Sequence, residues 1–470
     1  MPGLLRSTIA IFTSRDELSF RNIRGSLWAA FLVFPLSYIV CDMRFFGIET
    51  SILGLQTFEL LTFALGFGWF VPFFLPKAWI IPALRVSAVV CAVILPFQMI
   101  LPDGLHLLFM LLFFQFFIGI CLGTSFYIFC FTLNNIERLI GMCLVSFYFG
   151  IFYYVLFNIP AFVAFMRTWG SAMTMVLYLV VVFYSYRKED QQHRSGPDNN
   201  NYQHPVFLMT ILVVICHLMW YTINYTLLDE NASSLVFGLA APAAIVLICI
   251  MYFSMNAGTL HIWLLSLVFF LLGASLLLFD SLFAVNAGSF FYGLGDKAGF
   301  IIVYFMCGGA IKQCKSYKMY RIFCLMLFVI HAVLNGLLIY INNYFIGMSH
   351  IVGFGIILTL CCLCFSMLPY LQNRIFNAPW TDGLKLADMP EYKSALSELE
   401  ELDKIDNLGL SPREKEIFLL LLGDSQRKHI AHTLKVGEGT INFHVNNLYR
   451  KLGIQSRAEL FAKYHKYAKI

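Results

Sequence analysis

The chain has 470 residues, of which 59% are hydrophobic and only 13% are charged, and its mean hydropathy is +0.75. A soluble protein of this length has about a quarter of its residues charged, so this composition excludes a wholly soluble protein. The 48 Phe and 23 Tyr residues agree with this, because aromatic side chains suit lipid-facing and interfacial positions.

Apolar runs long enough for membrane helices begin near residue 23. A bilayer core needs about 20 apolar residues per helix. The sequence predicts twelve such runs in two sets of six, and the runs near 170–186 and 293–311 are the weakest because Arg167 and the pair Asp296 and Lys297 trim them. The twelve runs cover residues 23–40, 52–74, 79–99, 105–131, 140–162, 170–186, 205–227, 235–253, 262–283, 293–311, 320–340 and 351–371. The expected fold class is all-α, with a polytopic membrane bundle over residues 23–373.

The loop charges predict the orientation of this bundle. If residues 1–22 are cytoplasmic, only Arg44, Arg167 and Lys297 fall in outer loops, and the inner loops include the polar central loop 187–204. The inner loops then hold Arg15, Arg21, Arg24, Lys77, Arg138, Arg187, Lys188, Arg194, Lys312, Lys315, Lys318 and Arg321. Because cytoplasmic loops are rich in Lys and Arg, we expect a multi-pass protein of the cytoplasmic (inner) membrane, with both termini in the cytoplasm.

Ionisable residues inside apolar runs are candidates for function, because charges are costly in a bilayer. Glu59 and Arg85 are expected on neighbouring helices, where they can form a purely structural ion pair or line a ligand cavity. His217 is a third candidate for ligand binding, and its alternative is a hydrogen-bonded core residue. His331 and Asp280 qualify as well, whereas Asp296 and Lys297 are expected near the outer end of their helix, within reach of the interface.

Beyond the membrane runs the composition becomes polar, and charge separates into two segments. Residues 374–409 contain 4 Lys and Arg against 8 Asp and Glu, a net charge of −4. This acidic connector includes an expected short helix over 391–405, which either packs on the following domain or dimerises. Residues 410–470 contain 11 Lys and Arg against 5 Asp and Glu, a net charge of +6 that suits a polyanion.

The basic tail contains sequence signals for the starts and ends of four helices. Ser411 to Glu414 is a capping box with Pro412 at the first helical position, opening a helix to 422. Ser425 is expected to cap a second helix to 433, and a four-residue turn containing Gly437 leads to a third helix over 438–452. Gly453 ends that helix, and residues 456–459 form a second capping box. The second and third helices predict a helix-turn-helix.

These residues resemble the LuxR/GerE-type DNA-binding domain over about 60 residues. The resemblance rests on Leu410–Ser411–Pro412–Arg413–Glu414, Gly423, Ile430–Ala431, Leu434, Thr440–Ile441, His444, Asn447–Leu448, Lys451–Leu452–Gly453 and Ser456–Arg457. It implies a four-helix domain that binds double-stranded DNA as a homodimer, with the third helix in the major groove. The chain departs from the family at Gly437, where Ser is usual, and at Asn442, where a basic residue is usual.

The resemblance also suggests which residues meet DNA. The family's base-reading positions fall on Asn442, Phe443 and Asn446, beside His444. Asn can pair bidentately with adenine and Phe can touch a thymine methyl, so a half-site containing A and T is favoured. Phosphate contacts are expected from Arg427, Lys428, Thr440, Asn447 and Lys451, and the alternative for any one of them is an ordinary solvated helix face.

The rest of the chain leaves three functions open. Twelve helices in two halves are similar in layout to the major facilitator transporters, but the family's loop of glycine and arginine after the second helix is missing at residues 72–77. No catalytic, metal-binding or phosphate-loop pattern appears, so we expect neither an enzyme nor a cofactor. The leading expectation is a membrane-embedded transcription regulator that senses a small molecule; the alternatives are a transporter with a regulatory DNA-binding tail and a tether without a ligand.

Overall fold

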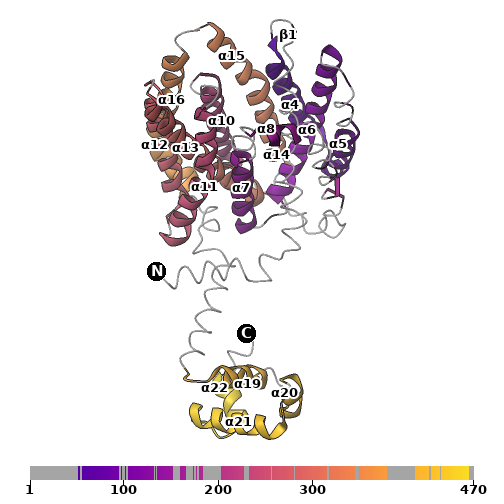
Figure 1. The fold of residues 1–470 in the computed structure, drawn as a ribbon, viewed down its shortest axis with the longest axis vertical. Coiled ribbons are helices and arrows are strands. Elements are labelled where there is room, and N and C mark those ends of the chain that lie inside the picture. The colour runs from indigo at the N-terminus through magenta and orange to yellow at the C-terminus, as the bar shows by residue number, and fades with distance from the viewer. Residues whose placement is uncertain are drawn as a thin grey trace. The chain divides into compact units, whose positions relative to one another are not determined.

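The structure is a computed structural model that consists mainly of helices (Figure 1). The residues it describes are 51–52, 55–94, 97, 101, 104–131, 133, 135–151, 159–165, 173, 176, 179–180, 182–183, 203–226, 232–255, 257–279, 281–314, 317–344, 349–377, 408–422, 425–434 and 436–464. They belong to two compact units, one within Leu18–Met389 and the other within Pro390–Ile470.

The larger unit is a bundle of helices (Figure 1). Its α-helices are α4 (Thr57–Phe74), α5 (Ile80–Ile94), α6 (Leu105–Phe131), α7 (Asn135–Tyr148), α8 (Pro160–Phe165), α10 (Gln203–Thr226), α11 (Ala232–Cys249), α12 (Thr259–Leu276), α13 (Leu282–Cys314), α14 (Tyr317–Phe328), α15 (Asn335–Tyr344), α16 (Ser349–Ser366) and α17 (Leu368–Leu371). Short 3-10 and π-helical turns are η2 (Lys77–Trp79), η9 (Ile250–Ser254), η10 (Val329–Leu334) and η11 (Gln372–Phe376). A two-residue antiparallel hairpin, β1 (Ser51–Ile52) with β2 (Leu55–Gln56), precedes α4.

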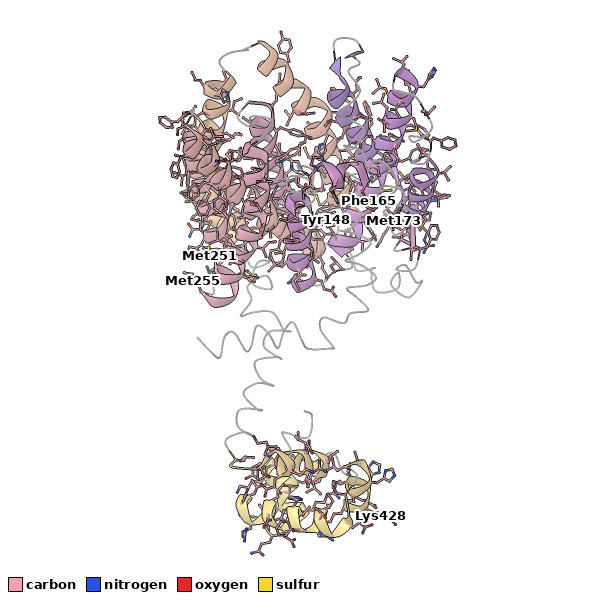
Figure 2. The ribbon with its side chains drawn as sticks, viewed as in Figure 1. Tyr148, Phe165, Met173, Met251, Met255 and Lys428 are labelled. Atoms are coloured by element: carbon pink, nitrogen blue, oxygen red, sulfur yellow. The ribbon has the colours of Figure 1, made fainter. Side chains whose placement is uncertain are left out.

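This bundle is a polytopic membrane domain. Seven helices among the described residues are long and apolar enough to cross a bilayer, and a bent pair, His350–Ser366 with Leu368–Phe376, makes an eighth if it is one span. Phe165 and Met173, labelled in Figure 2, are 47% and 63% exposed although they are apolar. Large apolar side chains on an outer surface are costly in water and suit lipid.

The sequence-predicted membrane runs can be compared with these helices. Ten of the twelve runs contain a described helix, and the run 105–131 coincides with α6 (Leu105–Phe131). The run 23–40 lies outside the described residues, as do most of 170–186, most of the loop 187–204 and most of the connector 374–409. The all-α class is confirmed, while the count of twelve stays a prediction.

Helix α13 (Leu282–Cys314) is the central helix of the described bundle. In its most apolar 18-residue stretch, 94% of the residues are buried, and the helix packs against α6, α7, α10, α11 and α12. Glycine permits some of this close packing, since a Cβ added at Gly273 of α12 would overlap the backbone of Tyr292. The core of the bundle therefore surrounds α13, and polar residues on α13 are held away from lipid.

The smaller unit contains four helices around its own core: α19 (Pro412–Leu422), α20 (Arg427–Thr433), α21 (Glu438–Leu452) and α22 (Arg457–Tyr464). All four contribute buried apolar side chains, including Phe418, Ile430, Val445 and Leu460. The helix bounds agree with the sequence prediction, and α21 coincides with residues 438–452. This core is independent of the bundle, so the unit has the means to fold by itself.

The capping of these helices follows the sequence prediction with one correction. Ser411 N–H donates to Glu414 Oε2 at 2.7 Å and Glu414 N–H donates to Ser411 Oγ at 3.3 Å, which is a reciprocal capping box. Gly453 ends α21 in the left-handed conformation, with φ 63°. The prediction that Ser425 caps the second helix was wrong: the N-cap of α20 is Gln426, which makes no side-chain capping bond.

Candidate DNA-binding face and membrane cavity

Helix α21 has one buried face and one exposed polar face. Ile441, Val445, Leu448, Tyr449 and Leu452 recur at helical spacing and are buried in the core of the small unit. The opposite face exposes Asn442, Phe443, Asn446 and Arg450, and the Phe443 side chain is 63% exposed. An exposed aromatic ring among amides and a guanidinium is unusual for a merely solvated helix, so this face is a candidate for contacts with bases.

The turn between α20 and α21 is braced by side chains from both helices. Arg427 Nη1 donates to Asn442 Oδ1 at 2.9 Å, although both residues are exposed. Arg413 reaches from α19 to the end of α20, where its Nη2 donates to the Leu434 carbonyl at 2.9 Å. These contacts brace the angle between α20 and α21.

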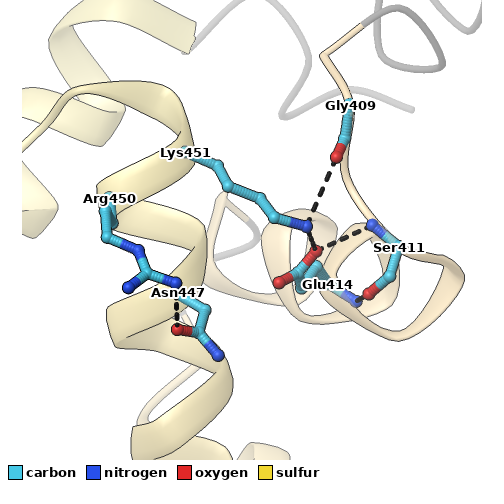
Figure 3. A network of polar contacts seen from close by, with 6 residues as sticks. All are labelled: Gly409, Ser411, Glu414, Asn447, Arg450 and Lys451. Carbon is cyan, nitrogen blue, oxygen red and sulfur yellow. Dashed lines mark hydrogen bonds and ion pairs between the residues drawn. The ribbon is translucent and has the colours of Figure 1, made fainter.

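Three polar residues join the end of α21 to the start of α19 (Figure 3). Lys451 Nζ donates to Glu414 Oε2 at 2.6 Å and to the Gly409 carbonyl at 3.4 Å. The Glu414 side chain is only 6% exposed, whereas the Lys451 side chain is 39% exposed. Burial alone would raise the pKa of Glu414, but the bonds from Lys451 and Ser411 outweigh it and hold that pKa below its ordinary value.

This network changes the role expected for Lys451. The sequence suggested a phosphate contact, but the Lys451 ammonium group donates a hydrogen bond to the buried carboxylate of Glu414. The spacing of residues in the sequence did not predict this contact. Lys428 fits a phosphate contact better, because it is exposed on α20 (Figure 2). Thr440 is exposed, while His444 and Asn447 are half-buried on the flank of α21.

One residue of the exposed face was missing from the sequence-predicted set. Arg450 follows Asn446 by four residues, as Asn446 follows Asn442, so helical spacing alone would have found it. Its Nη2 donates to Asn447 Oδ1 at 3.1 Å (Figure 3). The exposed polar face therefore runs from Asn442 to Arg450 and carries a cation at its C-terminal end.

The larger unit contains a cavity of about 70 Å³ whose polar residues come from four helical elements. They are Ser146 of α7, Cys216 and His217 of α10, Asp296 and Lys297 of α13, and His331 of η10; Val145, Phe149, Trp220 and Phe300 complete the lining.

A buried ion pair forms one wall of this cavity. Lys297 Nζ lies 2.6 Å from Asp296 Oδ2, and the two side chains are 5% and 6% exposed. The ammonium group also lies 5.1 Å from the ring centroid of Phe149 and 4.9 Å from that of Phe237. The prediction that this pair lies near the outer end of its helix was wrong, because α13 begins at Leu282, eleven residues before the predicted run, and places the pair near its middle.

Two histidines face each other beside the ion pair, with ring centroids 5.6 Å apart. His217 Nδ1–H donates to the Val213 carbonyl at 3.0 Å, and Nε2 accepts from the Tyr304 hydroxyl at 3.3 Å. His331 shares a hydrogen bond between its Nδ1 and the Tyr221 hydroxyl. His331 lies in the π-helical turn η10, and such turns often occur at functional sites.

The sequence-predicted ligand residues are only partly brought together. His217 lines the cavity, whereas Arg85 of α5 lies half-buried with its guanidinium 5.7 Å from the ring centroid of Phe183. Glu59 is in the first turn of α4, but its side chain lies outside the described residues. The pairing of Glu59 with Arg85 stays a prediction. Asp296, Lys297 and His331 are the residues that gather around His217 instead.

A short helix, a turn and a second helix with an exposed polar face, closed by flanking helices around one core, define a helix-turn-helix DNA-binding domain. Residues 408–463 match the family described as "Bacterial regulatory proteins, luxR family". The chain is 40% identical over 50 residues to the spore germination protein GerE of Bacillus subtilis (strain 168), which covers 11% of this chain and 68% of GerE. The chain belongs to the LuxR family of bacterial regulatory proteins, through this domain.

A solved structure resembles a larger part of the chain. It is a crystal structure of a mutant of the nucleoside transporter NupG, which is 12% identical, with a TM-score of 0.43, over 74% of this chain and 97% of that one. A likeness of this degree does not indicate what the membrane domain of this chain binds.

Proposed function

We propose that this protein is a membrane-embedded regulator that binds DNA sequence-specifically through the exposed face of α21. The single observation that carries the proposal is the arrangement of Asn442, Phe443 and Asn446 opposite a fully buried face, with Asn442 held by Arg427. Asn amides suit adenine and a Phe ring suits a thymine methyl, so this face favours half-sites that contain A and T.

Phosphate contacts would position this face in the major groove. Arg427, Lys428, Thr440 and Asn447 lie on or beside the exposed surface of α20 and α21, and Arg450 joins them at its end. Contacts with phosphates fix register and orientation without selecting a sequence. Two copies of the domain would bind as a homodimer across a two-fold symmetric operator.

The membrane domain would supply the signal. We infer that a small molecule in the cavity beside Asp296 and Lys297 favours one of two arrangements of the bundle, and that this changes how the DNA-binding domains reach an operator. A charged pair inside a membrane domain is costly, which supports a functional role for the cavity. The protein would lie in the cytoplasmic membrane with both termini in the cytoplasm, where the tail can meet DNA.

A reporter gene behind an operator selected by the purified tail tests this function. The full chain should change expression of the reporter, and Asn442→Ala with Asn446→Ala should abolish the change while the protein still reaches the membrane. Topology is checked by fusing a reporter enzyme that works only outside the cytoplasm. It should be active after residue 230 and silent after Ile470; activity at Ile470 would contradict the proposal.

A transporter with a regulatory DNA-binding tail is the second candidate. It is favoured by the same buried residues, since carboxylates and histidines inside membrane domains also mark ion and proton pathways. Uptake of a candidate molecule into proteoliposomes that contain the full chain would favour this candidate. A change in expression without uptake favours a sensor, and a response to no molecule at all favours a simple tether.

A further inference from the structure

The hydrogen-bonding groups of the membrane cavity are only partly satisfied. Ser146 is 1% exposed, and within the described part of the chain its Oγ has no hydrogen-bond partner although it lines the cavity. His331 uses Nδ1 for Tyr221, and no described residue bonds to its Nε2. A buried hydroxyl without a partner costs free energy, so these atoms mark where an occupant would form hydrogen bonds.

The charges of the cavity, by contrast, are already balanced. Asp296 and Lys297 neutralise each other at 2.6 Å, and the Lys297 ammonium is flanked by two aromatic rings. His217 has both ring nitrogens engaged, by the Val213 carbonyl and by the Tyr304 hydroxyl. A charged occupant would lose its hydration and meet no unpaired countercharge from any of the four lining elements.

The shape and the walls of the cavity restrict the occupant further. Phe149 and Trp220, with ring centroids 6.4 Å apart, and Phe300 give it aromatic sides. Its volume of about 70 Å³ is several times the roughly 10–15 Å³ that a water molecule needs, and about half the volume of a cavity that holds benzene. Aromatic walls favour flat ligands, and a volume about half that of a benzene-binding cavity limits them to a few non-hydrogen atoms, fewer than an aromatic ring contains.

We propose that the cavity binds an uncharged, planar molecule of a few non-hydrogen atoms, smaller than an aromatic ring, that both donates and accepts hydrogen bonds, with Ser146 and His331 as its polar contacts. This deepens the proposed sensing function and rests on it, but it concerns only the chemistry of the ligand. It also gives Asp296 and Lys297 a defined role: they hold one polar wall in place without selecting for charge.

Three probes of one shape test the proposal: acetamide, acetate and acetamidinium, which are neutral, anionic and cationic. Binding is measured by ligand-observed NMR on the full chain in lipid nanodiscs, with empty nanodiscs as background. We expect a Kd for acetamide at least about ten-fold lower than for either charged probe. Acetate or acetamidinium binding as tightly as acetamide would overturn the proposal, and so would the absence of binding by all three.

Two serine variants locate the site. Ser146→Ala should raise the Kd of acetamide about five-fold, as expected for one lost hydrogen bond. Ser125→Ala is the matched control, because Ser125 of α6 is also buried and its Oγ bonds to no described residue, but it does not line the cavity. Equal effects of the two variants would overturn the assignment. DNA binding by the tail is measured separately, so a failed regulator proposal and a wrong ligand class give different results.

Discussion

Arg427 of α20 donates a hydrogen bond of 2.9 Å to the amide oxygen of Asn442 in α21. The amide oxygen has a second lone pair, and the Nδ2 group remains as a donor, so Asn442 keeps both atoms that a bidentate contact with adenine requires. Arg427 thus orients the amide of Asn442 while its own charge stays at the edge of the exposed face of α21.

Asn442→Ala should therefore change which sequences are bound. We expect a loss of about 1–3 kcal/mol of discrimination at particular base pairs, and little change at the others. A fragment of residues 408–470 can be tested against randomised operators at two salt concentrations. His432→Ala, an exposed residue of α20, is the control. If the Asn442 variant only lowers affinity equally for all operators, the assignment of this residue to base contacts is wrong.

Lys451→Ala should lower the stability of the domain, whereas Lys428→Ala should weaken its binding to DNA. Loss of Lys451 leaves the buried Glu414 carboxylate with a missing partner, so the free energy of unfolding of the 408–470 fragment should fall by about 1–2 kcal/mol. Loss of the exposed Lys428 should leave stability unchanged, weaken binding to all sequences and flatten the salt dependence by about one phosphate contact. Denaturation curves and salt titrations distinguish the two, and a stable Lys451 variant with a reduced salt slope would contradict this division.

The stability of the DNA-binding domain should depend on pH through Glu414. Its pKa in the folded domain is below the ordinary value of about 4.5, because the bonds from Lys451 and Ser411 outweigh burial. The carboxylate therefore stabilises the fold fully above pH 4.5, and this contribution is lost as pH falls through the folded-state pKa. The difference in free energy of unfolding between the wild-type fragment and Glu414→Gln should shrink between pH 7 and pH 3.5. A constant difference would argue against the depressed pKa.

In the membrane domain, Asp296 and Lys297 should depend on each other. Asp296→Asn or Lys297→Met alone leaves a buried charge without its partner, which typically costs several kcal/mol, whereas the double variant removes both charges. Thermal unfolding in nanodiscs should show two unstable single variants and a more stable double variant. Lys318→Met is the control, since Lys318 of α14 is exposed. Additive losses in the double variant would show that the pair is not coupled.

Sequence patterns predicted the bounds of a uniformly apolar helix better than those of a helix that contains small and polar residues. The uniformly apolar α6 has the bounds that the sequence predicted, because apolar residues continue through every turn of the helix. In α13, residues such as Asn286, Gly288 and Ser289 lower the hydropathy before residue 293, so the predicted run started too late. A helix that contacts protein on nearly all sides needs small and polar residues for close packing. A prediction from hydropathy alone interprets these residues as the end of the helix.

In the tail, local patterns predicted the helices and missed the long-range contacts. The capping boxes, Gly453 and the apolar spacing of α21 are all encoded within a few residues of each other. The bond from Lys451 to Glu414 joins residues 37 apart, and that from Arg427 to Asn442 joins residues 15 apart. No periodicity encodes such pairs. The sequence could therefore place Lys451 on a helix without showing that its charge is paired with Glu414 in the folded domain.

The burial of α13 restricts how the cavity can diverge in evolution. Because most of α13 contacts other helices, a change of side-chain volume at Asp296 or Lys297 would disturb several helix pairs at once. Ser146 and Trp220 belong to α7 and α10, and Trp220 is only half-buried, so these positions leave more freedom to adjust. If the cavity senses a small molecule as proposed, homologues that respond to different molecules should vary at these two positions and share the residues of α13. Comparing gene copies within one genome would then show specificity changing around a fixed centre.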